Sequence, residues 1–262
     1  MEQSQAVASS RSPVAHGLAA SFAFKQATAI ERLPFTIRRV DSDADMQKAV
    51  QVRHAAYARH IPQFAQTLTA PEQSDYEDGA VVLLAESKLD GSALGSTRIR
   101  NNFYQPLSVE ASIMLPEWLQ QRRLAEVTRL SVNEGRIGAM VKVALLKACV
   151  TYCQDNAIEW ALATGRTPID RQYERLLFVD LFADKQPVPL KHVGNIPHRV
   201  MAFEIDTIEA RWTAAKHPML DFFCRTHHPD ININHPFDLE RAVPACRASS
   251  LAYESVAECA MA

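Results

Sequence analysis

The sequence predicts a domain of the α/β (α+β) class, with a mixed sheet flanked by helices. Short apolar runs alternate with amphipathic segments between residues 35 and 230, and a turn with Asp90-Gly91 joins two of those runs. Residues 1–34 are rich in Ala, Ser and Gln, so we expect a disordered leader there. Residues 231–262 are Ala-rich and should form a tail that could contain a short helix.

The first half of the domain should contain a strand, a helix and a hairpin. Asp41-Ser42-Asp43 supplies a helix cap, and apolar residues from Met46 to Tyr57 follow at helical spacing. Arg53 falls on the same apolar stripe, and a charge that is buried there needs a partner. The expected elements are a strand over residues 35–40, a helix from the cap to about residue 59, and strands over 80–86 and 93–100.

The second half should continue the alternation. Val141, Leu145, Ala148 and Tyr152 share one face of a strong helix. Pro168 is expected at the first position of a short helix. The expected strands cover residues 124–132, 159–164, 177–182 and 199–206, and the expected helices cover 136–154, 168–176 and about 207–215, with a last segment over 218–226.

Composition excludes several classes of protein. The 262 residues carry 28 Lys and Arg against 30 Asp and Glu, so no basic field favours nucleic acid. No run reaches the roughly 18–20 apolar residues of a membrane span. The 5 cysteines form no CxxC pair, which argues against a disulfide framework and favours the cytoplasm. Cys224, His227, His228 and His235 have a suggestive spacing for zinc, but no second close pair completes a site, so we expect no metal.

Charged residues interrupt the apolar runs at four places. They are Arg53 with Tyr57, Asp75 with Asp78, Arg98 in the hairpin, and Glu126 with Arg129 in an otherwise apolar strand. Each alone could be an ion pair or a turn that serves structure only. Ionisable groups in apolar surroundings also cluster at functional sites.

In their order, Arg53-x-x-x-Tyr57, Asp75-x-x-Asp78, Gly95-Ser-Thr-Arg98 and Glu126-x-x-Arg129 resemble the signature of two related families. These are the acyl-homoserine-lactone (autoinducer) synthases and the N-acyl amino acid synthases of the FeeM type, both in the GNAT-like acyltransferase superfamily. No Trp lies between Arg53 and Asp75, where autoinducer synthases carry one, which favours the second family. The resemblance covers residues 35–230 and implies a splayed central sheet.

The resemblance implies transfer of a fatty acyl group from a thioester to the amino group of an amino acid. Glu126 is the expected base, since apolar neighbours raise the pKa of a carboxyl. Simple alternation puts Glu126 and Arg129 on opposite faces, so the strand needs a bulge if both share the site. Tyr173 is expected to protonate the leaving thiolate. The expected substrate-binding residues are Arg53, Tyr57, Asp75, Asp78, Arg98 and Thr128, with the two arginines as ligands of a carboxylate.

The expected donor is the acyl-phosphopantetheine of an acyl carrier protein, with no tightly bound cofactor. Arg136 matches the first position of the GNAT loop that binds coenzyme A, but Ala139 and Val141 replace its small turn residues. Basic residues flanking the thioester entry should dock the carrier: Arg122, Arg123, Arg136, Lys142 and Lys147. Alternatives are a coenzyme A-dependent enzyme acting on a small amine and an inactive module that binds acyl carriers. A lipid product leaves contact with a membrane surface open.

Overall fold

The computed structural model describes residues 29–233, which form a mixed sheet with helices on both faces. The strand order is β11-β2-β3-β4-β5-β6-β9-β7, and β8 pairs with β9. The strands are β1 (Ala29–Ile30), β2 (Phe35–Arg39), β3 (Ala80–Ser87), β4 (Ala93–Asn101), β5 (Leu124–Val132), β6 (Trp160–Gly165), β7 (Val179–Asp180), β8 (Val188–Leu190), β9 (Ile196–Glu204), β10 (Thr226–His227) and β11 (Ile231–Asn232). The α-helices are α1 (Asp43–His60), α2 (Pro62–Ala65), α3 (Gly135–Asp155), α4 (Ile169–Arg175) and α5 (Ile208–Ala214).

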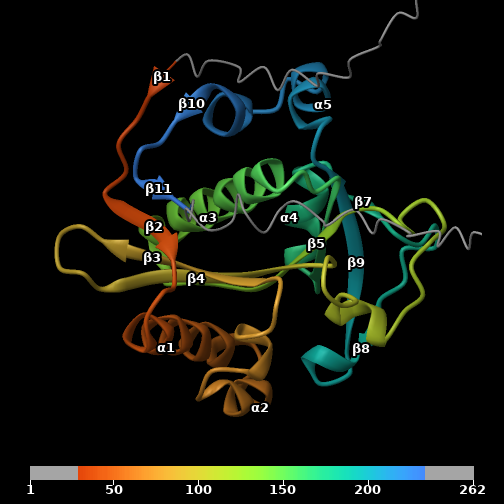
Figure 1. Cartoon of the computed structure of the whole chain (residues 1–262), viewed down its shortest axis with the longest axis horizontal. Coiled ribbons are helices and arrows are strands. Elements are labelled where there is room, and N and C mark those ends of the chain that lie inside the picture. Colours follow the sequence, from red (N-terminus) through yellow and green to blue (C-terminus); the bar gives the residue numbers. More distant parts are fainter. Residues whose placement is uncertain (1–28, 234–262) are drawn as a thin grey trace, which may run out of the picture.

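The helices α1 and α3 cover opposite faces of the sheet (Figure 1). Alternation along the strands decides which side chain meets which helix. On one face, Met46 and Ala49 of α1 pack against Val82 and Leu84 of β3. On the other face, the buried side of α3 packs against residues that alternate with these, including Leu83, Ala85, Ile99, Ala125 and Val127. The predicted hairpin, the predicted helices and the mixed sheet are therefore confirmed.

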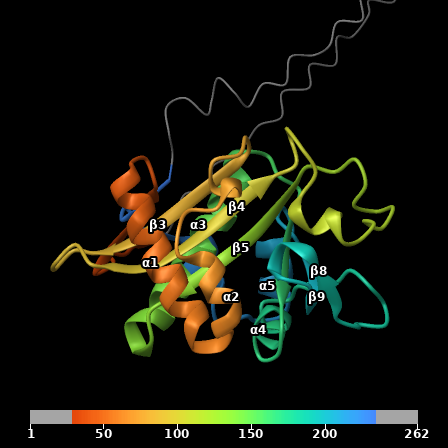
Figure 2. The same ribbon diagram turned by 90° about the horizontal axis from the view of Figure 1, so that it is seen from below.

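The parallel strands β5 and β6 separate part of the way along. Their pairing runs from Leu124↔Trp160 to Val127↔Ala163, the last pair described, although β5 continues to Val132. The sheet is thus splayed toward the end of β5 that leads into α3. Figure 2 views the molecule from the side of α1 and α2, with β5 running between the hairpin strands and β9.

Both ends of the described chain belong to the fold. β1 pairs with β10, β11 pairs with β2, and the side chains of Leu33 and Ile233 are buried. The predicted leader over residues 1–34 and the tail over 231–262 were therefore wrong at residues 29–34 and 231–233. Their remaining residues, 1–28 and 234–262, lie outside the described part.

Smaller differences have local causes. Pro168 is the N-cap of α4 and not its first residue. The strand predicted over 177–182 shrinks to β7, because Leu177 has a left-handed φ of 66°. The strand β8 and a π-helical turn over Asp221–Arg225 were not predicted. The helix α3 is long and apolar enough to match a membrane span, and its apolar side packs on the sheet as a core helix.

Candidate active site

A bulge in β5 gathers the charged residues on the face toward α1. Arg98 of β4 pairs with Thr128, but Ser96 pairs with Ser131, so β5 has an extra residue between these pairs. Arg129 lies there with a left-handed φ of 56°. The alternation reverses at this point. As a result Glu126, Thr128 and Arg129 face the same side, and the predicted bulge is confirmed.

Arg53 is fully buried and pairs with the carboxylate of Asp75. Its Nη1 and Nη2 donate to Oδ2 and Oδ1 of Asp75 at 2.8 and 2.9 Å. Arg98 donates to the same carboxylate at 3.0 Å and to Thr128 Oγ1 at 3.1 Å. The predicted partner of Arg53 therefore exists within the chain. Arg53 and Arg98 are bound to this carboxylate, which argues against their predicted role as ligands of a substrate carboxylate.

Glu72 completes this buried cluster, and sequence reasoning missed it. Arg129 donates to the Glu72 carboxylate from both Nε and Nη2 at 2.7 Å, and Arg53 and Arg98 each lie 3.2 Å from its Oε2. The guanidinium of Arg129 also lies over the ring of Phe64 at 5.1 Å. Glu72 lies in an irregular segment, where neither periodicity nor spacing gives a signal.

Charge balance keeps the cluster ionised despite its burial. Burial acts to raise the pKa of Glu72 and of Asp75, but the bonds and charges of the arginines outweigh it, so both pKa values are lowered. Burial and the repulsion of Arg129 lower the pKa of Arg98. Three guanidinium groups face two carboxylates, which leaves one positive charge beside the next residue of the site, Glu126.

Glu126 is buried at the centre of the sheet, and one of its oxygens lacks a hydrogen-bond partner. Its Oε2 accepts from the backbone N–H of Ser108 at 2.8 Å, whereas no described group donates to Oε1. Burial raises the pKa of this carboxyl, and the Ser108 N–H and the charge of Arg98 only partly oppose that. A carboxylate with a raised pKa and a free oxygen is suited to act as a general base.

His192, which sequence reasoning also missed, lies close to that oxygen. Its Nε2 lies 3.6 Å from Glu126 Oε1, and neither ring nitrogen has a hydrogen-bond partner among the described residues. Burial and the charge of Arg129 lower the pKa of His192 to about 4, so the ring is neutral at pH 7. Only the tertiary fold brings the turn after β8 to β5.

The remaining predicted substrate residues divide into two groups. Tyr57 is half-buried, with its ring 5.9 Å below the Arg129 guanidinium, and Thr128 is buried against Arg98. Asp78 is exposed in the turn before β3, so the structure does not bring it to the cluster.

Tyr173 lies on the other face of the sheet, next to the splay. It is buried on α4 against Gly165 and Phe178, and burial raises the pKa of its hydroxyl, which therefore stays protonated. It lines a small apolar cavity of about 30 Å³ together with residues of α3, β5, β6 and α5. That volume is about the volume that one water molecule occupies in liquid water.

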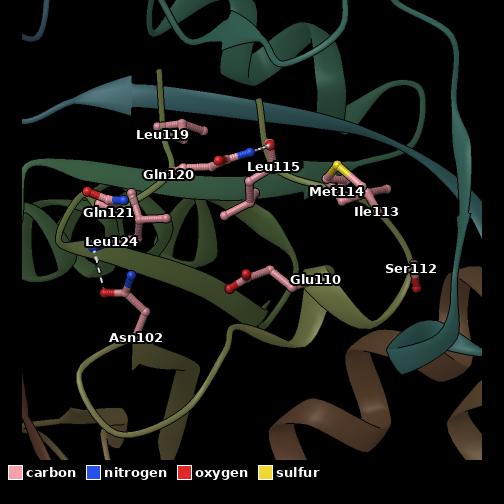
Figure 3. Close-up of a pocket in the computed structure, with 10 residues that line it drawn as sticks. All are labelled: Asn102, Glu110, Ser112, Ile113, Met114, Leu115, Leu119, Gln120, Gln121 and Leu124. Carbon is pink, nitrogen blue, oxygen red and sulfur yellow. Dashed lines mark hydrogen bonds between the residues drawn. The ribbon is translucent and has the colours of Figure 1, made fainter. Parts of the chain in front are cut away.

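A larger groove of about 590 Å³ lies where the loop after β4 returns to β5 (Figure 3). Apolar side chains from Ile113 to Leu124 line it together with Glu110 and Asn102, whose Oδ1 accepts from the Leu124 N–H at 2.9 Å. The 3-10 turn Ser108–Ala111 carries both Glu110 and the Ser108 N–H that binds Glu126. Leu124 and Glu126 share one face of β5, so this groove begins about 7 Å along the strand from Glu126.

The predicted docking residues do not form one patch. Arg122 and Arg123 precede β5, whereas Arg136 is exposed at the start of α3, and the nine residues of β5 separate them by about 30 Å. Arg122 pairs with Glu159, and half-buried Lys142 donates to Gln172. Lys147 is buried and donates to the carbonyls of Phe222 and Thr226 and contacts His228 Nδ1.

The turn into α3 contains two glycines with defined roles. Gly135 has a left-handed φ of 85°, and a Cβ on Gly138 would lie 1.7 Å from the carbonyl oxygen of Asn133. Val141 is fully buried and contacts Gly95, so it does not line the turn. The expectation that Val141 obstructs a phosphate loop was wrong, because the small residues lie earlier in the chain.

The zinc spacing does not become a site in the described residues. His228 binds Lys147, Cys224 lies on the π-helical turn, and His235 lies outside the described range. Within residues 29–233 no three His, Cys, Asp or Glu side chains gather as metal ligands do.

The splayed mixed sheet, with helices on both faces and a bulged central strand beside the splay, is the fold of the GNAT-like acyltransferases. Two solved structures have this fold in common with the chain. One is FeeM, an N-acyl amino acid synthase from uncultured soil microbes, with a TM-score of 0.53 and 15% identity over 72% of this chain and 97% of that one. The other is BjaI, a CoA-dependent acyl-homoserine lactone synthase, which was solved with SAM and isopentyl-CoA and also with MTA. The TM-score with BjaI is 0.51, with 15% sequence identity over 79% of this chain and 98% of BjaI. No protein-family model and no curated protein matches the sequence.

Proposed function

We propose that this protein is an N-acyltransferase that joins an acyl group, delivered as a thioester, to the amino group of an amino acid. One observation carries the proposal: Glu126 is a buried carboxylate with a raised pKa and a free oxygen, on the bulged strand beside the splay. The fold supports it, since FeeM makes N-acyl amino acids on the same architecture.

The reaction needs a base, a polarised carbonyl and an acid for the leaving thiolate. Glu126 takes a proton from the amine, whose nitrogen forms a bond to the thioester carbon. The C–S bond then breaks, and the thiolate takes a proton from Tyr173 on the other face of the splay. Backbone N–H groups of β5 beyond Val127, where the pairing with β6 has ended, are suited to receive the carbonyl oxygen.

The buried cluster of Arg53, Glu72, Asp75, Arg98 and Arg129 has a positioning role in this scheme. It joins α1, the segment before β3, β4 and the bulge of β5 through charge-assisted bonds. Held in this way, the bulge keeps a fixed shape, and Glu126 remains aimed at one point.

We propose acyl carrier protein as the donor and the coenzyme A thioester as its alternative. The alternative is favoured by the glycine turn at the start of α3, which leaves room for close approach to a helix N-terminus. BjaI, solved with isopentyl-CoA, supports it too. Both donors are made inside cells, which supports the proposed location in the cytoplasm.

The test is product formation by the purified protein. The protein is incubated with acyl-carrier and acyl-CoA thioesters and a panel of amino acids, and the products are identified by mass spectrometry. We expect an N-acyl amino acid, and at least a ~100-fold lower rate for Glu126→Gln at unchanged circular dichroism. The exposed Glu117→Gln is the matched control and should retain full activity.

Two other outcomes would contradict parts of this proposal. A Glu126→Gln protein with full activity would reject Glu126 as the base. No product from either donor with any amino acid would favour the inactive acyl-carrier-binding module instead.

A further inference from the structure

Three buried polar atoms without partners lie together at Glu126. They are Oε1 of Glu126 and both ring nitrogens of His192, and 3.6 Å separates Oε1 from Nε2. An unpaired buried polar atom has lost its bonds to water without replacement, so native proteins rarely keep one without a function. Three adjacent ones indicate that the two side chains act on each other or on a bound group.

The backbone of His192 is held in place by the charged cluster. Arg129 Nη2 donates to the carbonyl oxygen of His192 at 2.9 Å, while the same guanidinium binds Glu72. The 3-10 turn Lys191–Val193 is thereby fixed over the bulge of β5. Arg129 of the bulged strand thus fixes the turn in the position from which the imidazole faces Glu126.

We propose that His192 is a positioning residue for Glu126: as the neutral Nε2–H tautomer it donates to Oε1, holds the carboxylate ionised and orients it toward the acceptor amine. This inference rests on the proposed function. In the step itself an amine N–H bond breaks and an O–H bond forms on Glu126, while His192 keeps its own proton. No other reactant is required.

The groups that face Glu126 determine what a substitution does. Arg98 and Arg100 face it from β4, and Arg129 from its own strand. The Ser108 N–H donates from the 3-10 turn after β4, and His192 faces it from the turn after β8. His192 in turn is faced by Arg129, Arg98, Glu72 and, from β9, His198. The Ser108 side chain and the Val109 N–H also lower the pKa of Glu126, whereas the His192 ring is the group that faces Oε1, so removal of its N–H should raise the pKa of Glu126.

The first test is the pH profile of kcat/KM for acyl transfer by the full chain. In His192→Phe we expect the acidic limb to move up by about one pH unit and kcat to fall by about tenfold. His192→Gln keeps an N–H donor and should restore the wild-type limb. The exposed His60→Gln should match the wild type throughout. An unmoved limb in a folded, less active His192→Phe would assign His192 a structural role and overturn the proposal.

The second test needs no activity. Nitrogen-15 NMR of the full chain should find the neutral Nε2–H tautomer of His192 at pH 7, and Glu126→Gln should shift its resonances. The Nδ1–H tautomer, or resonances indifferent to Glu126→Gln, would overturn the pairing. If the wild type makes no product while the Nε2–H tautomer and its response to Glu126→Gln are found, the proposed function fails and the pairing stands.

Discussion

Arg129 and Glu126 lie three residues apart on β5 and still face the same side of the sheet. A regular strand would place them on opposite faces, but the left-handed φ of 56° at Arg129 reverses the alternation. A long side chain in this conformation is costly, on the order of 1–3 kcal/mol. The two bonds from Arg129 to Glu72 offset that cost. The bonds of the buried cluster therefore hold Arg129 in its strained conformation, and the cluster in turn needs Arg129 in that conformation to bind Glu72.

The carboxylates of Asp75 and Asp78 should differ sharply in their effect on stability. Asp75→Asn leaves Arg53 and Arg98 buried against a neutral amide, and we expect a loss of about 3–5 kcal/mol in the free energy of unfolding. Asp78→Asn changes an exposed group and should stay within about 0.5 kcal/mol of the wild type. Urea denaturation of both variants measures this difference. Equal losses of unfolding free energy would contradict the conclusion that Asp75, and not Asp78, faces the buried arginines.

His192 should make the folding stability depend on pH. Its pKa is about 4 in the folded chain against an ordinary 6.5, so the unfolded chain binds more protons between these values. The free energy of unfolding should therefore fall as the pH drops from 6.5 to 4, with about 3 kcal/mol assigned to this residue. Glu126, with a raised pKa, contributes the opposite slope and is present in both proteins compared. His192→Gln should show a flatter fall in urea titrations, and an identical slope would contradict the assignment.

Much of the fold could be predicted because its signals are local. Period-two and helical patterns and a cap at Ser42 predicted β2 to β6, α1 and α3 almost to the residue, whereas the short helix α2 was not predicted. Even the burial of Arg53 followed from its place on an apolar stripe. The ends of the fold were missed because β1, β10 and β11 have two residues each, too few for any period.

The site was predicted less completely, since tertiary pairing supplies half of it. Glu126 and Arg129 interrupt an apolar strand and attract notice, whereas Glu72 and His192 lie in short connecting segments, where no periodicity marks them. The docking residues were grouped because Arg123 and Arg136 are near in sequence. In the structure the extended strand β5 lies between them, so the two arginines are at opposite ends of that strand.

Gly138 and Ala139 are adjacent near the start of α3, and substitutions at the two positions should differ in their effect on the free energy of unfolding. A Cβ on Gly138 would meet the backbone oxygen of Asn133 at 1.7 Å, and backbone cannot yield as a side chain does. Gly138→Ala should therefore lower the free energy of unfolding by more than about 2 kcal/mol through displacement of the first turn of α3. Ala139→Gly, the matched change next to it, should cost about 1 kcal/mol from helix propensity. Thermal unfolding compares them, and a harmless Gly138→Ala would mean that the turn has room.

Carrier docking should depend on Arg136 and not on the other predicted arginines. The strands β5 and β6 diverge toward the start of α3, so under the proposed function we expect the thioester to enter at that end, where Arg136 is exposed. Arg123 lies about 30 Å away at the far end of β5, and Arg122 there is paired with Glu159. Arg136→Glu should therefore weaken binding to an acidic acyl carrier protein about tenfold at low salt, and less as salt rises. Arg123→Glu makes the same change in charge and should leave the Kd nearly unchanged. Titration of each variant with acyl carrier protein at two salt concentrations decides the matter: equal weakening would indicate a general charge effect, and weakening by Arg123→Glu alone would move the entry to the opposite end of the sheet.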